Sequence, residues 1–198
     1  DAIIVVMDAD GEDDASKLNQ LIKRAEKNQR GIIFAKRIKR TENIILKFLN
    51  NIRLIITFIL TGKFLNIGNF SAFSGKNLKN LLSNRNLTLA FSSGALKNIK
   101  KNYFLGVKKK NRYFGKSKVN FYFLIIHSIN IISVFYKEVF LRTSAVVLCY
   151  LIIRGPDNYI ATILMFYTLI NSCFILNYFL NINNFFDKKI TKTIKKIY

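Results

Sequence analysis

The feature of the sequence that most limits its fold is a run of 22 residues without a charged side chain, from Tyr159 to Leu180. A helix of this length spans the hydrocarbon core of a bilayer, which is about 30 Å thick. The apolar stretch 139–153 precedes it and carries one charge, Arg142, whose long side chain can extend toward the interface. A turn that holds the single proline, Pro156, separates the two stretches. The pattern predicts a transmembrane hairpin over 138–182.

The chain is also strongly basic, with 32 lysines and arginines against 11 acidic residues and a formal net charge of +21. Such a balance favours a nucleic acid or an anionic membrane surface as the partner. Here the basic residues alternate with isoleucine, phenylalanine and leucine instead of gathering in a polar arm. A nucleic-acid-binding protein also has no use for the uncharged run 159–180. The sequence therefore favours a membrane and excludes nucleic acid as the partner.

Basic residues flank the predicted hairpin on its outer sides, with Lys137 before it and 188–189 after it, whereas the turn holds one arginine, Arg154. Because lysine and arginine near a span stay on the cytoplasmic side, we expect both ends of the hairpin in the cytoplasm and the Pro156 turn outside. The sequence thus predicts a multi-pass protein of the cytoplasmic (inner) membrane. Its soluble part lies on the cytoplasmic face, and 183–198 form a basic cytoplasmic tail.

The first 35 residues have the pattern of an α/β fold. Residues 2–7 form a continuous apolar run, which is typical of a strand buried on both faces of a sheet. An acidic turn, 8–14, leads into helix-spaced apolar residues from Leu18 to Ala25 and then into a second apolar strand, 31–35. This order predicts a strand–helix–strand unit. Because the chain begins directly on a strand, we expect it to be a fragment that lacks an N-terminal part.

Two further segments have the composition of helices that contact a membrane. Residues 43–61 are apolar but interrupted by Lys47 and Arg53, so a spanning helix is an alternative there and not the prediction. Residues 119–137 gather their polar side chains within an arc of roughly 100° at helical pitch. The second pattern predicts an amphipathic helix that lies in the membrane interface.

The first candidate for chemistry is the pair Asp8 and Asp10, which directly follows the first strand. Ligands of α/β sheets bind at the carboxyl ends of the strands, and two carboxylates there can share one divalent cation. Hard oxygen ligands suit Mg²⁺ or Mn²⁺ bound jointly with a diphosphate. The alternative is an acidic turn that only caps the following helix. The sequence predicts a metal site at this position.

Two basic segments are candidates for binding phosphate. Residues 36–40 are expected to form a basic loop at the end of the second strand, where Arg37 could bind a phosphate through both arms of its guanidinium group. A second basic loop, 108–118, lies just before the interfacial helix, where basic residues meet lipid phosphates. Residues 108–110 are assigned to a general membrane-surface patch, which remains the alternative for the whole segment.

Taken together, these motifs resemble a known family. Val5-Val6-Met7-Asp8-Ala9-Asp10 is similar to the DxD strand of family-2 glycosyltransferases with the GT-A fold, and Gly68-Asn69-Phe70-Ser71 is similar to a later segment of theirs. Arg112-Tyr113-Phe114-Gly115-Lys116-Ser117-Lys118, followed by an interfacial helix and two spans, resembles the C-terminal part of the polyprenyl-phosphate group, which includes dolichol-phosphate mannose synthase-like enzymes. The resemblance covers nearly the whole chain but lacks the family's nucleotide-binding first half.

The resemblance implies a partial GT-A domain over 1–118 that transfers a sugar from a nucleotide-sugar donor to a polyprenyl-phosphate lipid, with inversion at the anomeric carbon. It implies a divalent metal, Mg²⁺ or Mn²⁺, at Asp8 and Asp10, and it counts Asp10 and Asn69 among the catalytic residues. Asn69 stands where other members carry an aspartate proposed as a base, so that role does not carry over. The residues that the resemblance assigns to the acceptor phosphate are Arg37, Arg112, Ser117 and Lys118.

An alternative from another class of protein stays open at this point. A small non-enzymatic membrane protein could use the same basic cytoplasmic part to bind anionic lipids or assembly partners. The acidic pair at the end of a buried strand argues against it, because a lipid-binding adaptor has no need of such a site. A homo-oligomer is left open in either case.

Overall fold

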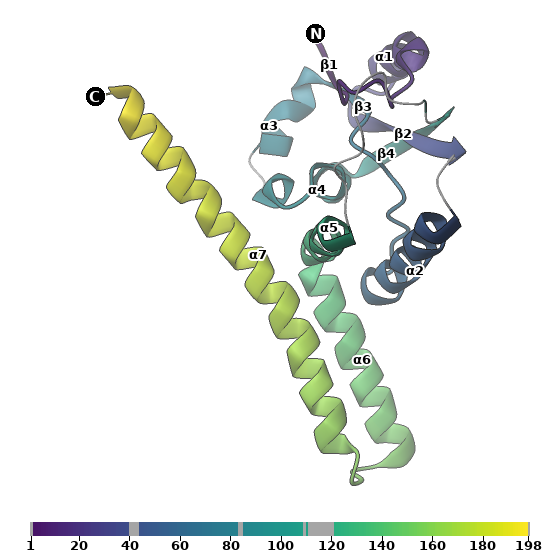
Figure 1. Ribbon diagram of the computed structural model, residues 1–198, viewed down its shortest axis with the longest axis vertical. Helices are drawn as coiled ribbons and strands as arrows, with labels where there is room; N and C mark the ends of the chain where they lie inside the picture. The colour runs from purple at the N-terminus through teal and green to yellow at the C-terminus, as the bar shows by residue number, and fades with distance from the viewer. Residues whose placement is uncertain (1, 40–43, 83–84, 109, 111–120, 198) are drawn as a thin grey trace.

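The computed structural model describes residues 2–39, 44–82, 85–108, 110 and 121–197, and for residues 37, 39, 44–46 and 184–197 it describes the backbone only. Figure 1 shows the arrangement of its elements. In chain order they are β1 (Ile3–Val6), η1 (Ala15–Lys17), α1 (Leu18–Lys27), β2 (Gly31–Lys39), α2 (Ile44–Thr61), β3 (Ser71–Ser74), η2 (Gly75–Asn77), α3 (Leu78–Leu82), η3 (Arg85–Thr88), α4 (Phe91–Asn98), β4 (Lys101–Lys108), α5 (Phe121–Ser133), α6 (Tyr136–Arg154) and α7 (Ile160–Ile197).

The four strands form one mixed sheet in the order β1-β3-β2-β4. Strand β3 runs antiparallel to both β1 and β2, so β1 and β2 run in the same direction with β3 between them. Strand β4 pairs in parallel with β2. The predicted α/β class and strand–helix–strand order are therefore confirmed, although the two strands of that unit are not neighbours in the sheet.

Strand β2 is longer than predicted. It pairs with β4 from Gly31 as far as Lys39, with an irregularity between Arg37 and Lys39. The expected basic loop over 36–40 is therefore wrong for residues 36–39, and residue 40 lies outside the described residues. The basic side chains of this segment belong to a strand whose backbone groups are paired with β4.

Helices cover both faces of the sheet, because β2 alternates its buried side chains between them. Ile33 and Ala35 pack with Leu21 and Ala25 of α1 on one face. On the other face Ile32, Phe34 and Phe73 pack with residues of α3 and α4, namely Leu81 and Ala95. A side chain buried on each face explains why residues 31–35 form one uninterrupted apolar run.

Helices α6 and α7 contact each other and run side by side away from the part of the molecule that holds the sheet (Figure 1). Among the described residues, α7 is the helix that is long and apolar enough by itself to cross a membrane, over Ile160–Asn183. Helices α5 and α6 meet at a bend of 82° and reach that length and hydropathy as a pair. The boundaries differ from the prediction at two places, since α6 begins at Tyr136 and α7 continues as a helix to Ile197.

The two long helices are joined by polar side chains. Asn171, which is buried, donates from Nδ2 to Thr143 Oγ1 at 3.0 Å, and the Ser144 and Tyr167 hydroxyls lie 3.0 Å apart. Asn177 Nδ2 similarly donates to Ser133 Oγ at 2.9 Å, across to the end of α5. Interhelical hydrogen bonds of this kind associate helices where a hydrophobic driving force is absent.

The bend between α5 and α6 is fixed to the sheet-containing part through Lys97 of α4. Its Nζ donates to the carbonyl oxygen of Val134 at 2.6 Å and to Glu138 Oε2 at 3.3 Å. The same ammonium lies 5.3 Å from the centre of the Phe135 ring. Burial is the main cause that lowers the pKa of Lys97, opposed by Glu138. This junction sets the direction in which the hairpin leaves the sheet.

Candidate functional site

The candidate site is the acidic loop, residues 8–14, which leaves the carboxyl end of β1. Its own carboxylates hold it in shape, because Asp13 Oδ2 accepts the backbone N–H of Asp8 at 3.1 Å and Asp10 Oδ1 accepts that of Glu12 at 3.0 Å. Gly11 lies between them with φ of 83°, a conformation that side chains with a Cβ rarely adopt. These hydrogen bonds and the backbone angle of Gly11 fix the conformation of the loop.

The four aspartates of the acidic loop divide into two pairs by exposure. Asp13 and Asp14 are buried, and Asp14 caps the next helical turn by accepting the Ser16 N–H at 3.1 Å and the Ser16 hydroxyl at 2.7 Å. Asp8 is exposed and Asp10 is half-buried. Capping thus falls to Asp14, whereas Asp8 and Asp10 present carboxylates that solvent reaches.

Asn69 belongs to the same edge of the sheet. It is exposed and lies two residues before Ser71, the residue of β3 that pairs with both Val6 of β1 and Phe34 of β2. Because β3 runs antiparallel to β1, its beginning lies where β1 ends. The carbonyl oxygen of Asn69 accepts the Ser71 hydroxyl at 3.0 Å, which fixes the entry to the strand.

A residue that sequence reasoning missed connects the acidic loop to the end of β4. The backbone N–H of Lys110 donates to the carbonyl oxygen of Glu12 at 2.9 Å, and its ammonium lies 2.8 Å from Asp14 Oδ1. This ammonium, together with Ser16, lowers the pKa of Asp14 from 3.8 to about 2. The pairing of Lys110 with the buried Asp14 is a structural contact that the prediction of a general membrane-surface patch did not include.

The predicted phosphate-binding residues are described only in part. The backbone of Arg37 pairs with Val107 of β4, at the edge to which the acidic loop belongs. Arg112, Ser117 and Lys118 lie outside the described residues. Lys110, which precedes these three residues in the sequence, contacts the acidic loop at Glu12 and Asp14.

The residues of the acidic loop fit a divalent cation only when a bound substrate supplies the remaining coordinating oxygen atoms. Among the described residues no three His, Cys, Asp or Glu side chains are grouped to hold a metal ion. Asp8 and Asp10 together offer up to four hard oxygen atoms, which suits Mg²⁺ or Mn²⁺ but leaves coordination positions for other oxygens. A diphosphate would provide them.

We predict that Lys110→Met raises the pKa of Asp14 toward 3.8, because the substitution removes the main group that stabilises its charge. The pKa of Asp14 is lower in the folded state than in the unfolded state. The charged Asp14 therefore stabilises the fold fully above about pH 4, and this stabilisation is lost as the pH falls toward 2. An NMR titration of the Asp14 carboxyl carbon measures the shift. Lys17→Met in the adjacent turn is the control, and an unchanged Asp14 pKa in Lys110→Met would contradict the pairing.

No protein-family model matches the chain, and a search against curated proteins finds no significant match.

Proposed function

We propose that the chain belongs to a membrane-bound glycosyltransferase that moves a sugar from a nucleotide-sugar to a polyprenyl phosphate. The observation that carries the proposal is the contact between Lys110 and the acidic loop. The acidic loop holds Asp8 and Asp10, whose carboxylates suit a metal bound with a diphosphate. Lys110 connects this loop to the chain segment whose sequence continues into Arg112, Ser117 and Lys118. A donor site and an acceptor-phosphate site must adjoin in such an enzyme.

In this proposal Asp8 and Asp10 hold a divalent cation, Mg²⁺ or Mn²⁺, with the donor diphosphate. When bound, the metal neutralises the negative charge that develops on the leaving diphosphate. Asp13 and Asp14 stabilise the loop by accepting hydrogen bonds from its backbone and from Ser16, so that the carboxylates of Asp8 and Asp10 keep their spacing.

The acceptor phosphate needs no strong base. The second pKa of a phosphate monoester is about 6, so a polyprenyl phosphate is largely ionised at neutral pH. This property makes an asparagine at position 69 compatible with the reaction. Arg37, Arg112, Ser117 and Lys118 would orient the acceptor. One phosphate oxygen then forms a bond to the anomeric carbon while the bond from that carbon to the diphosphate breaks, which inverts the centre.

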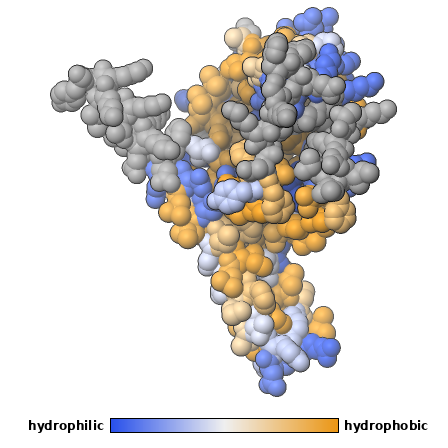
Figure 2. Space-filling view, viewed as in Figure 1, coloured by the Kyte–Doolittle hydropathy of each residue, from blue (hydrophilic) through white to orange (hydrophobic). Residues whose placement is uncertain are grey.

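The apolar surfaces at the base of the molecule support attachment to a membrane. Figure 2 shows hydrophobic residues concentrated where the hairpin leaves the sheet-containing part and along the hairpin. Large apolar side chains are exposed on α2 and α5, which contact each other. They include Ile52, Ile55, Ile56 and Ile59 of α2, and Phe121, Tyr122, Phe123, Ile125 and Ile126 of α5. We infer that α5 lies in the interface and that α6 is a second span beside α7.

The experiment that tests the proposal measures release of the nucleoside diphosphate from a nucleotide-sugar by the full-length protein in lipid bilayers. We expect release that needs both polyprenyl phosphate and Mn²⁺ or Mg²⁺, and that stops with a chelator. Release that continues without the lipid acceptor, or in the presence of the chelator, would contradict the proposed reaction. A protein that only binds anionic lipids would release nothing.

We predict that both ends of the hairpin lie in the cytoplasm, because basic residues flank it and the turn holds only Arg154. A reporter fused after Tyr198 should be active as a cytoplasmic fusion, and a tag inserted at Asn158 should be labelled from outside the cell. A tag at Asn158 that is protected in intact cells and labelled only after lysis would mean that α6 and α7 do not form a spanning hairpin.

A further inference from the structure

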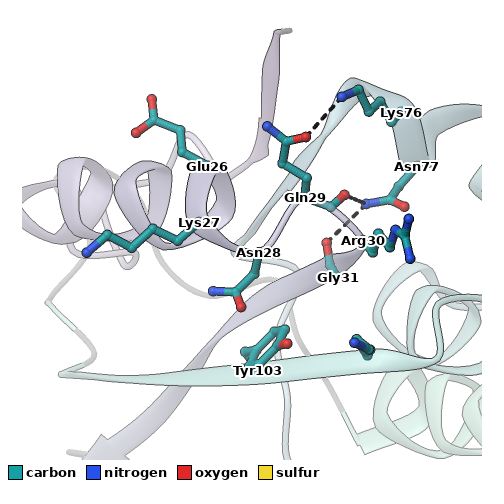
Figure 3. Close-up of a pocket in the computed structure, with 10 residues that line it drawn as sticks. Glu26, Lys27, Asn28, Gln29, Arg30, Gly31, Lys76, Asn77 and Tyr103 are labelled. Atoms are coloured by element: carbon teal, nitrogen blue, oxygen red, sulfur yellow. Dashed lines mark hydrogen bonds between the residues drawn. The ribbon is translucent and has the colours of Figure 1, made fainter.

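A basic hollow lies at the edge of the sheet opposite the acidic loop, where β2 and β4 begin. Its volume is about 780 Å³. Its lining comes from the end of α1, the turn into β2, η2 and the start of β4. It consists of Glu26, Lys27, Asn28, Gln29, Arg30, Gly31, Lys76, Asn77, Lys101 and Tyr103 (Figure 3). Neither the metal nor the acceptor assigned above involves any of these residues.

The wall of the hollow is fixed by hydrogen bonds between segments distant in the sequence. Asn77, which is buried, donates from Nδ2 to the carbonyl oxygens of Gln29 at 2.8 Å and Gly31 at 3.1 Å. Lys76 Nζ donates to Gln29 Oε1 at 2.9 Å. These bonds connect the turn between α1 and β2 to η2, so this part of the wall is fixed by the fold.

Tyr103 forms the floor beside the first residue of β2. A Cβ on Gly31 would lie 2.7 Å from Tyr103 Cε2 and 2.9 Å from the carbonyl oxygen of Lys101. Glycine at this position therefore allows the ring to lie against the strand, and Figure 3 shows the ring across from Gly31. The phenol hydroxyl adds a hydrogen-bond donor to the basic side chains of the hollow.

The charges of the hollow favour an anion. Four basic side chains and one acidic side chain, Glu26, line it, and Figure 3 shows the Glu26 carboxylate pointing away from Arg30. Arg30 and Lys101 are exposed and form no ion pair with another residue of the described part of the chain. The guanidinium group of arginine matches the geometry of a phosphate, and lysine adds a mobile positive charge.

The position of the hollow favours a soluble ligand over a lipid headgroup. Helix α2, which contacts α5 and α6 at the base of the molecule, follows the opposite end of β2. A strand of the length of β2, Gly31–Lys39, extends for about 30 Å, so the hollow lies about that far from the end of β2 that leads to α2. Its volume lies within the range of small-molecule sites and exceeds what one phosphate ion fills.

We propose that this hollow binds a small soluble anion that carries two or more phosphate groups. Arg30 and Lys101 contact the phosphates, with Lys76 and the Tyr103 hydroxyl beside them. The site is independent of the proposed transferase reaction, since it lies at the other edge of the sheet.

The test is calorimetric titration of inorganic pyrophosphate into the full chain in nanodiscs of neutral lipid. A chelator is present so that metal-dependent binding at Asp8 and Asp10 does not contribute. We expect the double variant Arg30→Gln, Lys101→Gln to bind pyrophosphate at least about tenfold more weakly, since it loses charged hydrogen bonds to the ligand. The matched control is Lys23→Gln, Lys79→Gln, which removes the same charge from exposed positions outside the hollow and should change the affinity less than about twofold.

Equal weakening in both double variants would show attraction to the basic chain as a whole and would overturn the proposal, as would failure of the unsubstituted chain to bind pyrophosphate. Thermal unfolding of each variant checks that its fold is kept. A second titration in nanodiscs with anionic lipid distinguishes the two sources of phosphate. Unchanged pyrophosphate affinity supports a soluble ligand, whereas competition by the lipid would mean that headgroups reach the hollow and would contradict the proposal.

Discussion

Asp10→Asn is expected to abolish metal-dependent sugar transfer by the full-length protein while membrane insertion is unchanged. The substitution keeps the size of the side chain and an oxygen that can accept the Glu12 N–H, which Asp10 Oδ1 accepts at 3.0 Å. It removes one of the two accessible negative charges that would hold the cation. Metal ions supply several kcal/mol of charge stabilisation, so the rate should fall by roughly a hundredfold or more.

The matched control for this variant is Asp157→Asn, which removes a carboxylate from the turn between α6 and α7. Its transfer rate should equal that of the unsubstituted protein. Rates are measured at saturating Mn²⁺ and again after chelation. Full activity of Asp10→Asn that is also insensitive to the chelator would show that the acidic loop does not hold a catalytic metal.

Arg112→Ala is expected to weaken use of the lipid acceptor by roughly ten- to a hundredfold. A hydrogen bond from a charged group to a phosphate contributes on the order of 1.5–3 kcal/mol, which corresponds to this range. The effect should appear as a higher apparent KM for polyprenyl phosphate or a lower turnover, with little change in binding of the nucleotide-sugar.

Lys108→Ala is the matched control for Arg112→Ala, because Lys108 is an exposed basic residue at the end of β4. It should alter membrane affinity slightly and turnover hardly at all. If both substitutions reduced activity equally, and by an amount that depended only on ionic strength, the basic segment would be a general membrane-surface patch.

The sequence predicted the elements whose pattern is local. All but the first residue of the uncharged run 159–180 lies in α7, and the apolar run 2–7 contains β1, because length and uniform hydropathy determine both. The acidic residues after β1 were likewise expected to form a turn before a helix. The pattern did not distinguish the structural aspartates of that turn, Asp13 and Asp14, from the accessible pair, Asp8 and Asp10. Burial of Asp13 and Asp14 depends on neighbours from elsewhere in the chain.

The greater length of β2 and the contact of Lys110 with Asp14, which sequence reasoning missed, both depend on β4. Its residues, Lys101–Lys108, do not alternate regularly between polar and apolar side chains, and both ends are lysines, so the sequence predicted no strand there. The strand exists because it pairs with β2, and the same pairing extends β2 to Lys39. Lys110 reaches Asp14 only because β4 runs parallel to β2 and ends at the edge of the acidic loop. A pairing between distant segments leaves no periodic signal in the sequence.

The central claim is that the sugar is transferred to the phosphate of a membrane lipid. The measurement that tests it most directly is mass spectrometry of the lipid fraction after the full-length protein, in a bilayer with Mn²⁺ and polyprenyl phosphate, receives an isotope-labelled nucleotide-sugar. The proposal predicts a labelled polyprenyl phosphate heavier by one sugar residue, with the anomeric configuration inverted relative to the donor. Label found only as free sugar, or a lipid fraction without label at saturating metal and donor, would contradict it.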